Sequence, residues 1–393
     1  MIPQEELKNR LDNLRNRLNT YCPQWEIAVI TQKVSLYYLT GTMASGTLWI
    51  ERDGRASFFV RRGYERAVIE SKFPDMRRMN SFRDMAADVN NTSKSVLLEK
   101  NSMPLSFFEL FNKYFNFETI GSLDSHLMAI RAVKSPFEIN RIRKAGKIHA
   151  LVLEELVPKM LKEGMSEAEL SSTLLKTLID NNAHGIARLN MHDMEFLLGY
   201  VGFSENNLMV TNFDGPDGNT GLHPSAPFMG SRDRKLKKGD IIFIDIGCGY
   251  KGYHTDKTSV YAFGKAPSQE VVDIHNKCVD VMNKTAAMLK PGNIPSQIYE
   301  NIMAGLDDEF KTNFMGIGNS AVKFLGHSIG LHIDEMPAIA KGFDEPLQEN
   351  MVIALEPKKA IENIGMVGTE NTFIVTPNGG QLVTGSKHQI IVV

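Results

Sequence analysis

Cysteine is scarce in this chain, and the three that it has, Cys22, Cys248 and Cys278, lie far apart with no CxxC spacing. This scarcity excludes a disulfide scaffold and a thiolate zinc site, and it suits a reducing compartment. An excess of charge is also absent, because 44 Lys and Arg residues face 46 Asp and Glu residues. The balance gives no electrostatic reason to expect nucleic acid or an anionic membrane surface as a partner.

Long apolar runs are missing as well. No stretch approaches the ~18 apolar residues that a membrane-spanning helix needs. Residues 1–18 are charged and helical in pattern, without the apolar core of a secretory signal. We therefore expect no membrane partner and a cytoplasmic location. The 393 residues, 42% of them hydrophobic, are enough for two domains of ~100–200 residues with sizeable cores.

The first part of the chain, residues 1–125, predicts a small α/β domain. Four leucines recur at helical spacing within residues 5–19 and predict a surface helix there. Asp53-Gly54, between two apolar segments, is a hairpin signal. The other predicted segments are short apolar stretches at 26–30, 36–39, 47–51 and 57–60, a strand at 95–98, and helices at 64–71 and 105–114.

The second part, residues 130–393, predicts an α+β domain. Serine–glutamate capping boxes at 135–138 and 166–169 predict two helix starts, the first with proline in the opening position. Further helices are expected after residue 268 and near residue 295, and strands at 240–247, 253–263, 351–355 and 369–375. Because the helices alternate with hairpins rather than with single strands, an antiparallel sheet is favoured.

Two acidic residues interrupt apolar strand patterns in the segment GDIIFIDIGCGYKGYHTDKTSVYAF. Asp245 and Asp256 are symmetric about Tyr250-Lys251, so a hairpin turning there would place their Cβ atoms about 4.5–5.5 Å apart. Two carboxylates so close repel each other. They need a shared proton, a cationic partner or a metal ion.

The same symmetry recurs for Glu356 and Glu370, which flank a turn-like stretch centred on Asn363. Four carboxylates on two hairpins leave two interpretations open. They form buried salt bridges with Lys257 or Lys358, or they bind hard or borderline divalent ions such as Mn, Co, Fe or Zn.

A histidine is the fifth candidate ligand. His327 lies in FLGHSIG between Gly326 and Gly330, where the small neighbours let backbone or substrate approach closely. Beside a carboxylate cluster, an imidazole is a natural anchor for a transition metal.

These five residues, taken in order, resemble the metal ligands of the pita-bread metallopeptidases of family M24. That family includes methionine aminopeptidase, prolidase and aminopeptidase P, with creatinase as a metal-free relative. The matching strings are IDIG, TDKT, GHSIG, LEP and TEN at the ligands, Arg131–Ser135 with Glu138 and Ile139 at the start of the catalytic domain, and YLTGT at Tyr38–Thr42. The last string and the hairpin after it resemble the creatinase-type N-terminal domain, so the resemblance covers essentially the whole chain.

The resemblance implies a two-metal hydrolase. Asp256 and Glu370 would bridge the two ions. Asp245 would chelate one ion, and His327 and Glu356 would complete the coordination of the other. A hydroxide bridging the two ions would attack a peptide carbonyl, and Glu356 would move the proton. Manganese is favoured among Mn, Co, Zn and Fe.

Three other positions bear on catalysis through the resemblance. His223, in TGLHPSAP, matches a histidine held near the substrate carbonyl, although it also fits an ordinary loop before proline. Seven residues after His327, most relatives have a second catalytic histidine, whereas this chain has Asp334. We expect His332 to take over part of that role, because both positions would face one side of an extended strand. Gly368 stands where relatives often carry arginine, so a fixed cation near the ligands is missing.

The resemblance to the prolidase and aminopeptidase P branch implies a homodimeric peptidase that removes the N-terminal residue from short peptides, with proline in the second position. The N-terminal domain favours this branch, because methionine aminopeptidases usually lack it. Two alternatives stay open: a non-catalytic binding protein on the same fold, which Asp334 keeps in view, and a creatinase-like amidinohydrolase that needs no metal. The presence of all five candidate ligands argues against both.

Overall fold

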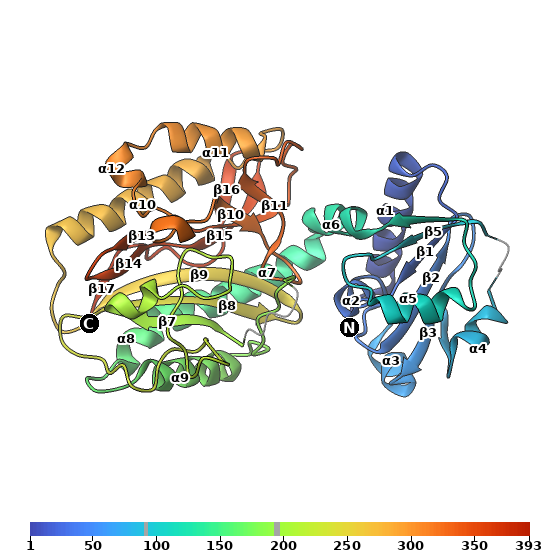
Figure 1. Ribbon diagram of the computed structural model, residues 1–393, viewed down its shortest axis with the longest axis horizontal. Helices are drawn as coiled ribbons and strands as arrows, with labels where there is room; N and C mark the ends of the chain where they lie inside the picture. The colour runs from blue at the N-terminus through green and yellow to red at the C-terminus, as the bar shows by residue number, and fades with distance from the viewer. Residues whose placement is uncertain (90–92, 192–196) are drawn as a thin grey trace. The chain divides into compact units, whose positions relative to one another are not determined.

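The computed structural model describes residues 1–89, 93–191 and 197–393 (Figure 1). The chain forms two compact units, Met1–Arg131 and Ala132–Val393. The predicted domain limits at 125 and 130 both fall inside one helix, α6 (Asp124–Ala132), which ends where the second unit begins. Among the described residues, no helix is both long and apolar enough to cross a lipid bilayer.

The first unit is an α/β domain built on one mixed sheet of six strands, in the order β4-β3-β2-β1-β5-β6. The strands β1, β2 and β3 pair antiparallel, and β4, β5 and β6 join them in parallel. The strands are β1 (Ile27–Ile30), β2 (Ser45–Glu51), β3 (Ala56–Arg62), β4 (Met76–Arg78), β5 (Ser95–Leu98) and β6 (Thr119–Ser122). The helices before α6 are α1 (Gln4–Tyr21), α2 (Lys33–Thr40), α3 (Tyr64–Glu70), α4 (Phe82–Ala86) and α5 (Leu105–Asn112).

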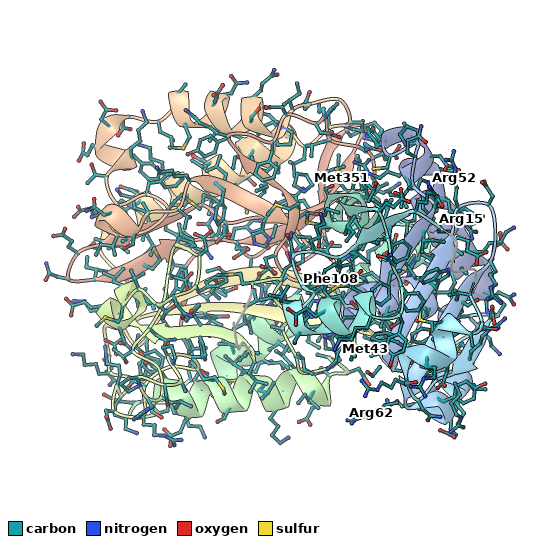
Figure 2. The ribbon with its side chains drawn as sticks, turned by 45° about the vertical axis from the view of Figure 1, so that its right-hand side comes forward. Arg15, Met43, Arg52, Arg62, Phe108 and Met351 are labelled. Atoms are coloured by element: carbon teal, nitrogen blue, oxygen red, sulfur yellow. The ribbon has the colours of Figure 1, made fainter. Side chains whose placement is uncertain are left out.

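Helix α1 confirms the predicted leucine stripe, because three of its four leucines are buried. Arg15 on this helix donates to the carbonyl oxygens of Glu51 at 3.2 Å and Gly54 at 2.8 Å, which ties the helix to the predicted β2–β3 hairpin (Figure 2). The apolar segment 36–39 lies in α2, whose start is capped by the Gln32 side chain.

The second unit has the predicted α+β architecture with antiparallel sheets. Five strands form one sheet, β11-β10-β12-β15-β16, and four form another, β17-β9-β8-β7, in which β17 runs parallel to β9. A two-stranded ribbon, β13-β14, extends the hairpin between β12 and β15. In Figure 1 the helices α7, α8 and α9 cover one side of this unit and α10, α11 and α12 the other, with the sheets between them.

Both predicted capping boxes are present in this unit, at Ser135 with Glu138 and at Ser166 with Glu169. The strands are β7 (Gly199–Phe203), β8 (Ile241–Tyr250), β9 (Tyr253–Ala262), β10 (Phe324–Ser328), β11 (Glu335–Ala340), β12 (Val352–Leu355), β13 (Lys358–Ile361), β14 (Gly365–Gly368), β15 (Asn371–Thr376), β16 (Gly379–Leu382) and β17 (Ile391–Val392). The α-helices are α7 (Pro136–Ala150), α8 (Val157–Met160), α9 (Glu167–Asp180), α10 (Gln269–Ala287), α11 (Pro295–Ala304) and α12 (Asp308–Lys311), with a π-helical stretch at Leu151–Leu156.

The β8–β9 hairpin corrects the first predicted carboxylate pair. The turn falls at Lys251-Gly252, one residue later than predicted, so Asp245 faces Thr258 and not Asp256. The two aspartates share one face of the sheet but are diagonal neighbours, about 7–8 Å apart in such ladders. Both turn residues have positive φ, 48° and 96°, which a tight two-residue hairpin of this hand requires and which glycine allows most easily.

The second predicted pair is confirmed. Strand β12 pairs with β15 up to Leu355 and Asn371, and β13 pairs with β14 in the same register. Glu356 follows Leu355 and Glu370 precedes Asn371, so the two glutamates lie across from each other on the two arms of one long hairpin.

Candidate active site

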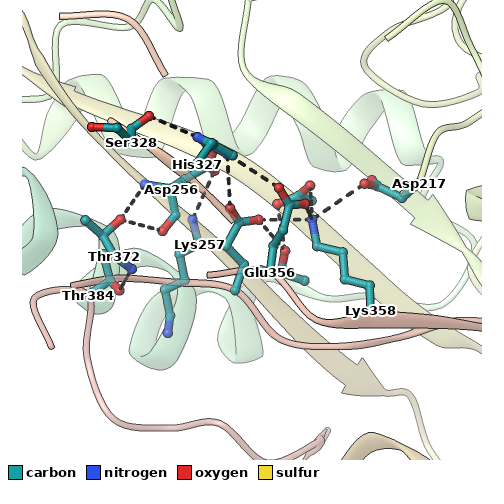
Figure 3. Close-up of polar contacts among 12 residues, drawn as sticks. Asp217, Asp256, Lys257, His327, Ser328, Glu356, Lys358, Thr372 and Thr384 are labelled. Carbon is teal, nitrogen blue, oxygen red and sulfur yellow. Dashed lines mark hydrogen bonds and ion pairs between the residues drawn. The ribbon is translucent and has the colours of Figure 1, made fainter. Parts of the chain in front are cut away.

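Three side chains from separate elements converge on one buried point of the second unit. Asp256 comes from β9 and His327 from β10, as labelled in Figure 3, and Glu370 comes from the position just before β15. One ligand atom of each lies within 4.8 Å of the other two, close enough for all three to bind one metal ion. Both carboxylates are buried, and the imidazole side chain is 16% exposed. Three of the five predicted ligands therefore form a group of the size that a metal ion needs.

The other two predicted ligands, Asp245 and Glu356, face Lys358. The lysine Nζ lies 2.8 Å from Asp245 Oδ2, 2.8 Å from Glu356 Oε2 and 3.0 Å from Glu370 Oε2. A further carboxylate, Asp217, has its Oδ1 3.7 Å away. The lysine side chain is fully buried, so this cluster of ion pairs lies out of reach of bulk water.

The two interpretations of the carboxylates are thus realised side by side. Lys358 makes the buried salt bridges that one of them required. Lys257 points elsewhere, with its Nζ 2.8 Å from Asn371 Oδ1 and 3.4 Å from Glu154 Oε1. The group around His327 could hold the metal ion that the other interpretation required.

Burial and the lysine together set the protonation of the cluster. Burial by itself would raise the pKa of Asp245, but the Lys358 ammonium and its hydrogen bond hold that pKa at about 2. Burial and the negative charge of Asp245 raise the pKa of Asp256 to about 7. Burial and the charge of Asp256 likewise raise the pKa of Glu370 well above its usual range. A divalent cation would offset the repulsion between these last two carboxylates, because it is the largest local charge wherever it binds.

His327 is oriented so that Nε2 faces the carboxylates. Its Nδ1 lies 3.1 Å from the carbonyl oxygen of Ser328, which assigns the Nδ1 proton to that hydrogen bond. Its Nε2 lies 3.4 Å from Glu356 Oε1 and 3.8 Å from Glu370 Oε1. Burial would lower the pKa of this imidazole, but the hydrogen bond with Glu356 raises it to about 9. A metal ion that binds Nε2 would therefore displace a proton.

The donor set fits a divalent ion that prefers oxygen and nitrogen. It offers one imidazole nitrogen and two carboxylates, with no thiolate among the three residues. Glu370 Oε1 is buried and has no hydrogen-bond donor among the described residues. This oxygen faces His327, so its lone pairs are available to a cation at that point.

A cavity of about 700 Å³ opens beside these residues. His327 and Glu356 lie in its wall, together with Asp334 and the exposed Lys323. The apolar part of the wall is formed by Val322, Phe324, Ile333, Met336 and Phe343, among others. The volume falls in the ~300–1,000 Å³ range typical of small-molecule sites.

Asp334 lies in the cavity wall, and His332 is not among the residues that line the cavity. Residues 330–334 form a bend between β10 and β11, so the alternation of an extended strand does not apply to them. His332 is buried, and its backbone nitrogen donates to Glu335 Oε1 at 3.2 Å. The extended strand on which the argument for a catalytic His332 was based is therefore absent from residues 330–334, and the role of His332 stays a prediction.

His223 lies on an exposed loop. Its Nδ1 is 2.8 Å from Ser225 Oγ, and its backbone pairs with Ala226. It is not among the residues that line the cavity at His327. These surroundings are those of a loop histidine before proline, and a place beside the substrate carbonyl stays a prediction.

Gly368 explains why arginine is absent from its position. Its φ is 129°, and a Cβ there would lie 2.4 Å from the carbonyl oxygen of Pro357 and 2.6 Å from Lys358 Cα. Because both of those atoms belong to the backbone, neither can move aside cheaply. The cation missing at this position is supplied from the opposite strand, where Lys358 pairs with Gly368.

Asp217 is the site residue that the sequence did not reveal. It is buried beside Lys358, and burial together with the charge of Asp245 raises its pKa well above the usual range. It lies in the stretch DGPDGNTG, which has neither strand alternation nor hairpin symmetry. Only an acidic residue between glycines marked the position, and many surface loops share that feature.

Comparison with known proteins identifies the family. Residues 140–377 match the model of metallopeptidase family M24, and residues 10–133 match the creatinase/prolidase N-terminal domain. An Xaa-Pro dipeptidase of Pyrococcus horikoshii is 25% identical over 370 residues, which cover 93% of this chain and 94% of that protein. An uncharacterized peptidase of Staphylococcus aureus is 26% identical over 384 residues, covering 95% of this chain and 97% of that protein.

Solved structures share the fold. The Xaa-Pro dipeptidase from Bacillus anthracis aligns with a TM-score of 0.79 at 21% identity, covering 98% of this chain and 100% of that one. The X-Pro aminopeptidase from Thermotoga maritima aligns with a TM-score of 0.75 at 24% identity, covering 94% and 98% of the two chains. These likenesses establish the predicted combination of a creatinase-type N-terminal domain with a pita-bread catalytic domain. The chain belongs to metallopeptidase family M24, as the order of its acidic residues and histidine predicted.

Proposed function

We propose that this metallopeptidase hydrolyses the N-terminal peptide bond of short peptides whose second residue is proline. The observation that carries the proposal is the group formed by Asp256, His327 and Glu370, of which His327 lines a cavity large enough for a short peptide. The curated relatives named Xaa-Pro dipeptidase support the choice of substrate. The apolar side chains in the cavity wall suit the ring of a proline residue.

A divalent ion held by Asp256, His327 and Glu370 would supply Lewis-acid activation of the scissile carbonyl and of water. Glu356 is placed to move the proton, because it lies in the cavity wall and contacts His327. Burial would raise the pKa of Glu356, but the positive charges of Lys358 and His327 lower it. The carboxylate is therefore ionised near neutral pH and able to accept a proton.

Manganese, a homodimer and a cytoplasmic location complete the proposal. Oxygen and imidazole ligands without thiolate suit manganese, although they also suit cobalt, zinc or iron. The three free cysteines suit a reducing compartment. Resemblance to the prolidase branch supports the homodimer.

The test is hydrolysis of a matched peptide panel by the purified protein, with added Mn²⁺ or Co²⁺ and with a chelator. The panel holds Xaa-Pro dipeptides, Xaa-Pro-Yaa tripeptides and the same peptides with Ala in place of Pro. We expect metal-dependent cleavage of the proline peptides and at least a ~100-fold loss in kcat/KM in His327→Ala, because a metal ligand matters no less than its second-sphere partners. Cleavage of dipeptides alone would indicate prolidase activity, and cleavage of tripeptides would indicate aminopeptidase P activity.

Lys358 gives the metal-free alternatives a specific observation in their favour. Its single positive charge pairs with three carboxylates without any added ion, as a binding protein or a creatinase-like hydrolase on this fold would need. Full activity in the presence of a chelator, or no cleavage by protein shown to contain metal, would contradict the metallopeptidase proposal.

A further inference from the structure

We propose that this site takes one divalent ion per chain and that the ammonium group of Lys358 holds the place of a second. The inference rests on the proposed metal-dependent function, since it concerns how many ions the same site accepts. It replaces the two-ion arrangement that the resemblance implied with an arrangement of one metal ion and one built-in organic cation.

The lysine is bound as completely as an ammonium can be. An ammonium has three donors, and Lys358 Nζ has three carboxylate oxygens at 2.8, 2.8 and 3.0 Å. The side chain is fully buried, and the aromatic ring of Phe243 lies 5.9 Å from Nζ. All three donors of the ammonium are therefore used by carboxylates.

The two glutamates divide their oxygens between the two cation positions. Glu356 directs Oε1 to His327 Nε2 at 3.4 Å and Oε2 to Lys358 at 2.8 Å. Glu370 directs Oε1 to His327 Nε2 at 3.8 Å and Oε2 to Lys358 at 3.0 Å. One oxygen of each glutamate thus serves the group around His327, and the other is already bonded to the ammonium. The pattern is that of two carboxylates shared between two neighbouring cations.

A second divalent ion would need oxygens that Lys358 already holds. Asp245 is the predicted ligand that belongs to that ion alone, and its Oδ2 is bonded to the lysine while its Oδ1 accepts from Thr258 at 2.7 Å. A divalent ion bound to Asp245 Oδ2 and Glu370 Oε2 at about 2.0–2.2 Å would lie almost in contact with the ammonium, because the ion and the ammonium would share the same two oxygens. Two cations cannot occupy that space together.

The backbone keeps the lysine in place. Lys358 begins β13 and pairs with Gly368, whose lack of a Cβ lets the two strands lie close together. Its neighbour Lys359 points to the other side of the ribbon and donates to the carbonyl oxygens of Phe310 at 3.0 Å and Thr312. The two adjacent lysines therefore bind different partners, so a substitution of Lys359 is a matched control for the same substitution of Lys358.

The experiment is a count of bound ions in the purified full-length protein. Wild type, Lys358→Met and Lys359→Met are dialysed against the same Mn²⁺ solution, and bound manganese per chain is measured by elemental analysis. Electron paramagnetic resonance distinguishes an isolated Mn²⁺ from an exchange-coupled pair. We expect one isolated ion per chain in wild type and in Lys359→Met, and two coupled ions in Lys358→Met. Lys358→Arg, which keeps the charge, should bind one.

Each outcome decides a different point. Two ions in the wild type would overturn the inference and leave Lys358 as a fixed cation beside a two-metal centre, with the proposed function intact. One ion in both the wild type and folded Lys358→Met would show that the lysine holds no ion's place. No bound ion in the wild type would contradict the metal-dependent function itself. If Lys358→Met does not fold, the wild-type count still decides between one ion and two.

Discussion

Among single residues, Gly326 controls the position of the histidine beside it. It lies in β10 opposite Leu355 of β12, and a Cβ on it would lie 2.1 Å from the carbonyl oxygen of Ala354. The obstacle is backbone, so β10 would have to move away from β12. His327, the next residue, would move with it and away from the carboxylates.

We therefore expect Gly326→Ala to lower the free energy of unfolding by about 1–3 kcal/mol, the usual range for overpacking. It should also weaken metal binding. Unfolding by urea, measured with excess chelator, separates the first effect from the second. Gly305→Ala is the matched control, because its nearest atom would be 3.5 Å away, and it should change stability by less than about 0.5 kcal/mol. Equal stability of the two variants would refute the packing argument.

At the scale of elements, helix α7 and strand β9 each bury a histidine. Burial and the positive charge of Lys257 lower the pKa of His149 to about 3. Burial and the neighbouring His184 lower the pKa of His254 to about 3. His149 also contacts Thr255 of β9, with Nδ1 3.2 Å from Oγ1. Both rings are therefore neutral in the folded protein over the whole range in which free histidine titrates.

These depressed values predict loss of stability in acid. Above pH ~6.5, these rings are neutral in both the folded and the unfolded protein, so their full contribution to the free energy of unfolding is present. As the pH falls from ~6.5 towards 3, only the unfolded state takes up the protons, so each histidine costs about 1.4 kcal/mol per pH unit. We expect His149→Gln to make the fall in unfolding free energy between pH 6.5 and 5 shallower by about that slope. Parallel pH profiles for the variant and the wild type would contradict the assignment.

At the scale of the whole molecule, the group formed by Asp256, His327 and Glu370 would link folding to metal binding. Its three members come from positions 256, 327 and 370, so they meet only when β9, β10 and the hairpin before β15 are all in place. An ion that binds this arrangement and not the unfolded chain stabilises the folded state.

We expect Mn²⁺ at 100 times its Kd to add about 2.7 kcal/mol to the free energy of unfolding, and EDTA to remove that gain. Scanning calorimetry with and without the metal measures the change in Tm. If the two units unfold in separate transitions, only the transition of Ala132–Val393 should move, because all three ligands belong to that unit. A metal-induced shift of the other transition alone would contradict the assignment of the site.

The sequence by itself determined the local elements and the identity of the candidate ligands. Capping boxes, leucine spacing and hairpin symmetry depend on residues close together in the chain, so they could be found by inspection. The symmetry of Glu356 with Glu370 held because one continuous register runs through that hairpin. The predicted pairing of Asp245 with Asp256 was wrong by one residue. The turn falls at Lys251-Gly252, which adopt the positive φ angles of a tight hairpin turn, and not at Tyr250-Lys251.

Only the tertiary structure decided how the carboxylates are shared between a lysine and the histidine. This sharing depends on where distant segments such as those of Asp245 and Lys358 come to lie, and no periodicity in the chain encodes their distance in space. Lys358 and Lys257 were equal candidates in the sequence, yet only the first bonds three of the predicted ligands. Burial makes these pairings necessary, because a charged side chain in the interior is strongly destabilising unless an opposite charge lies beside it.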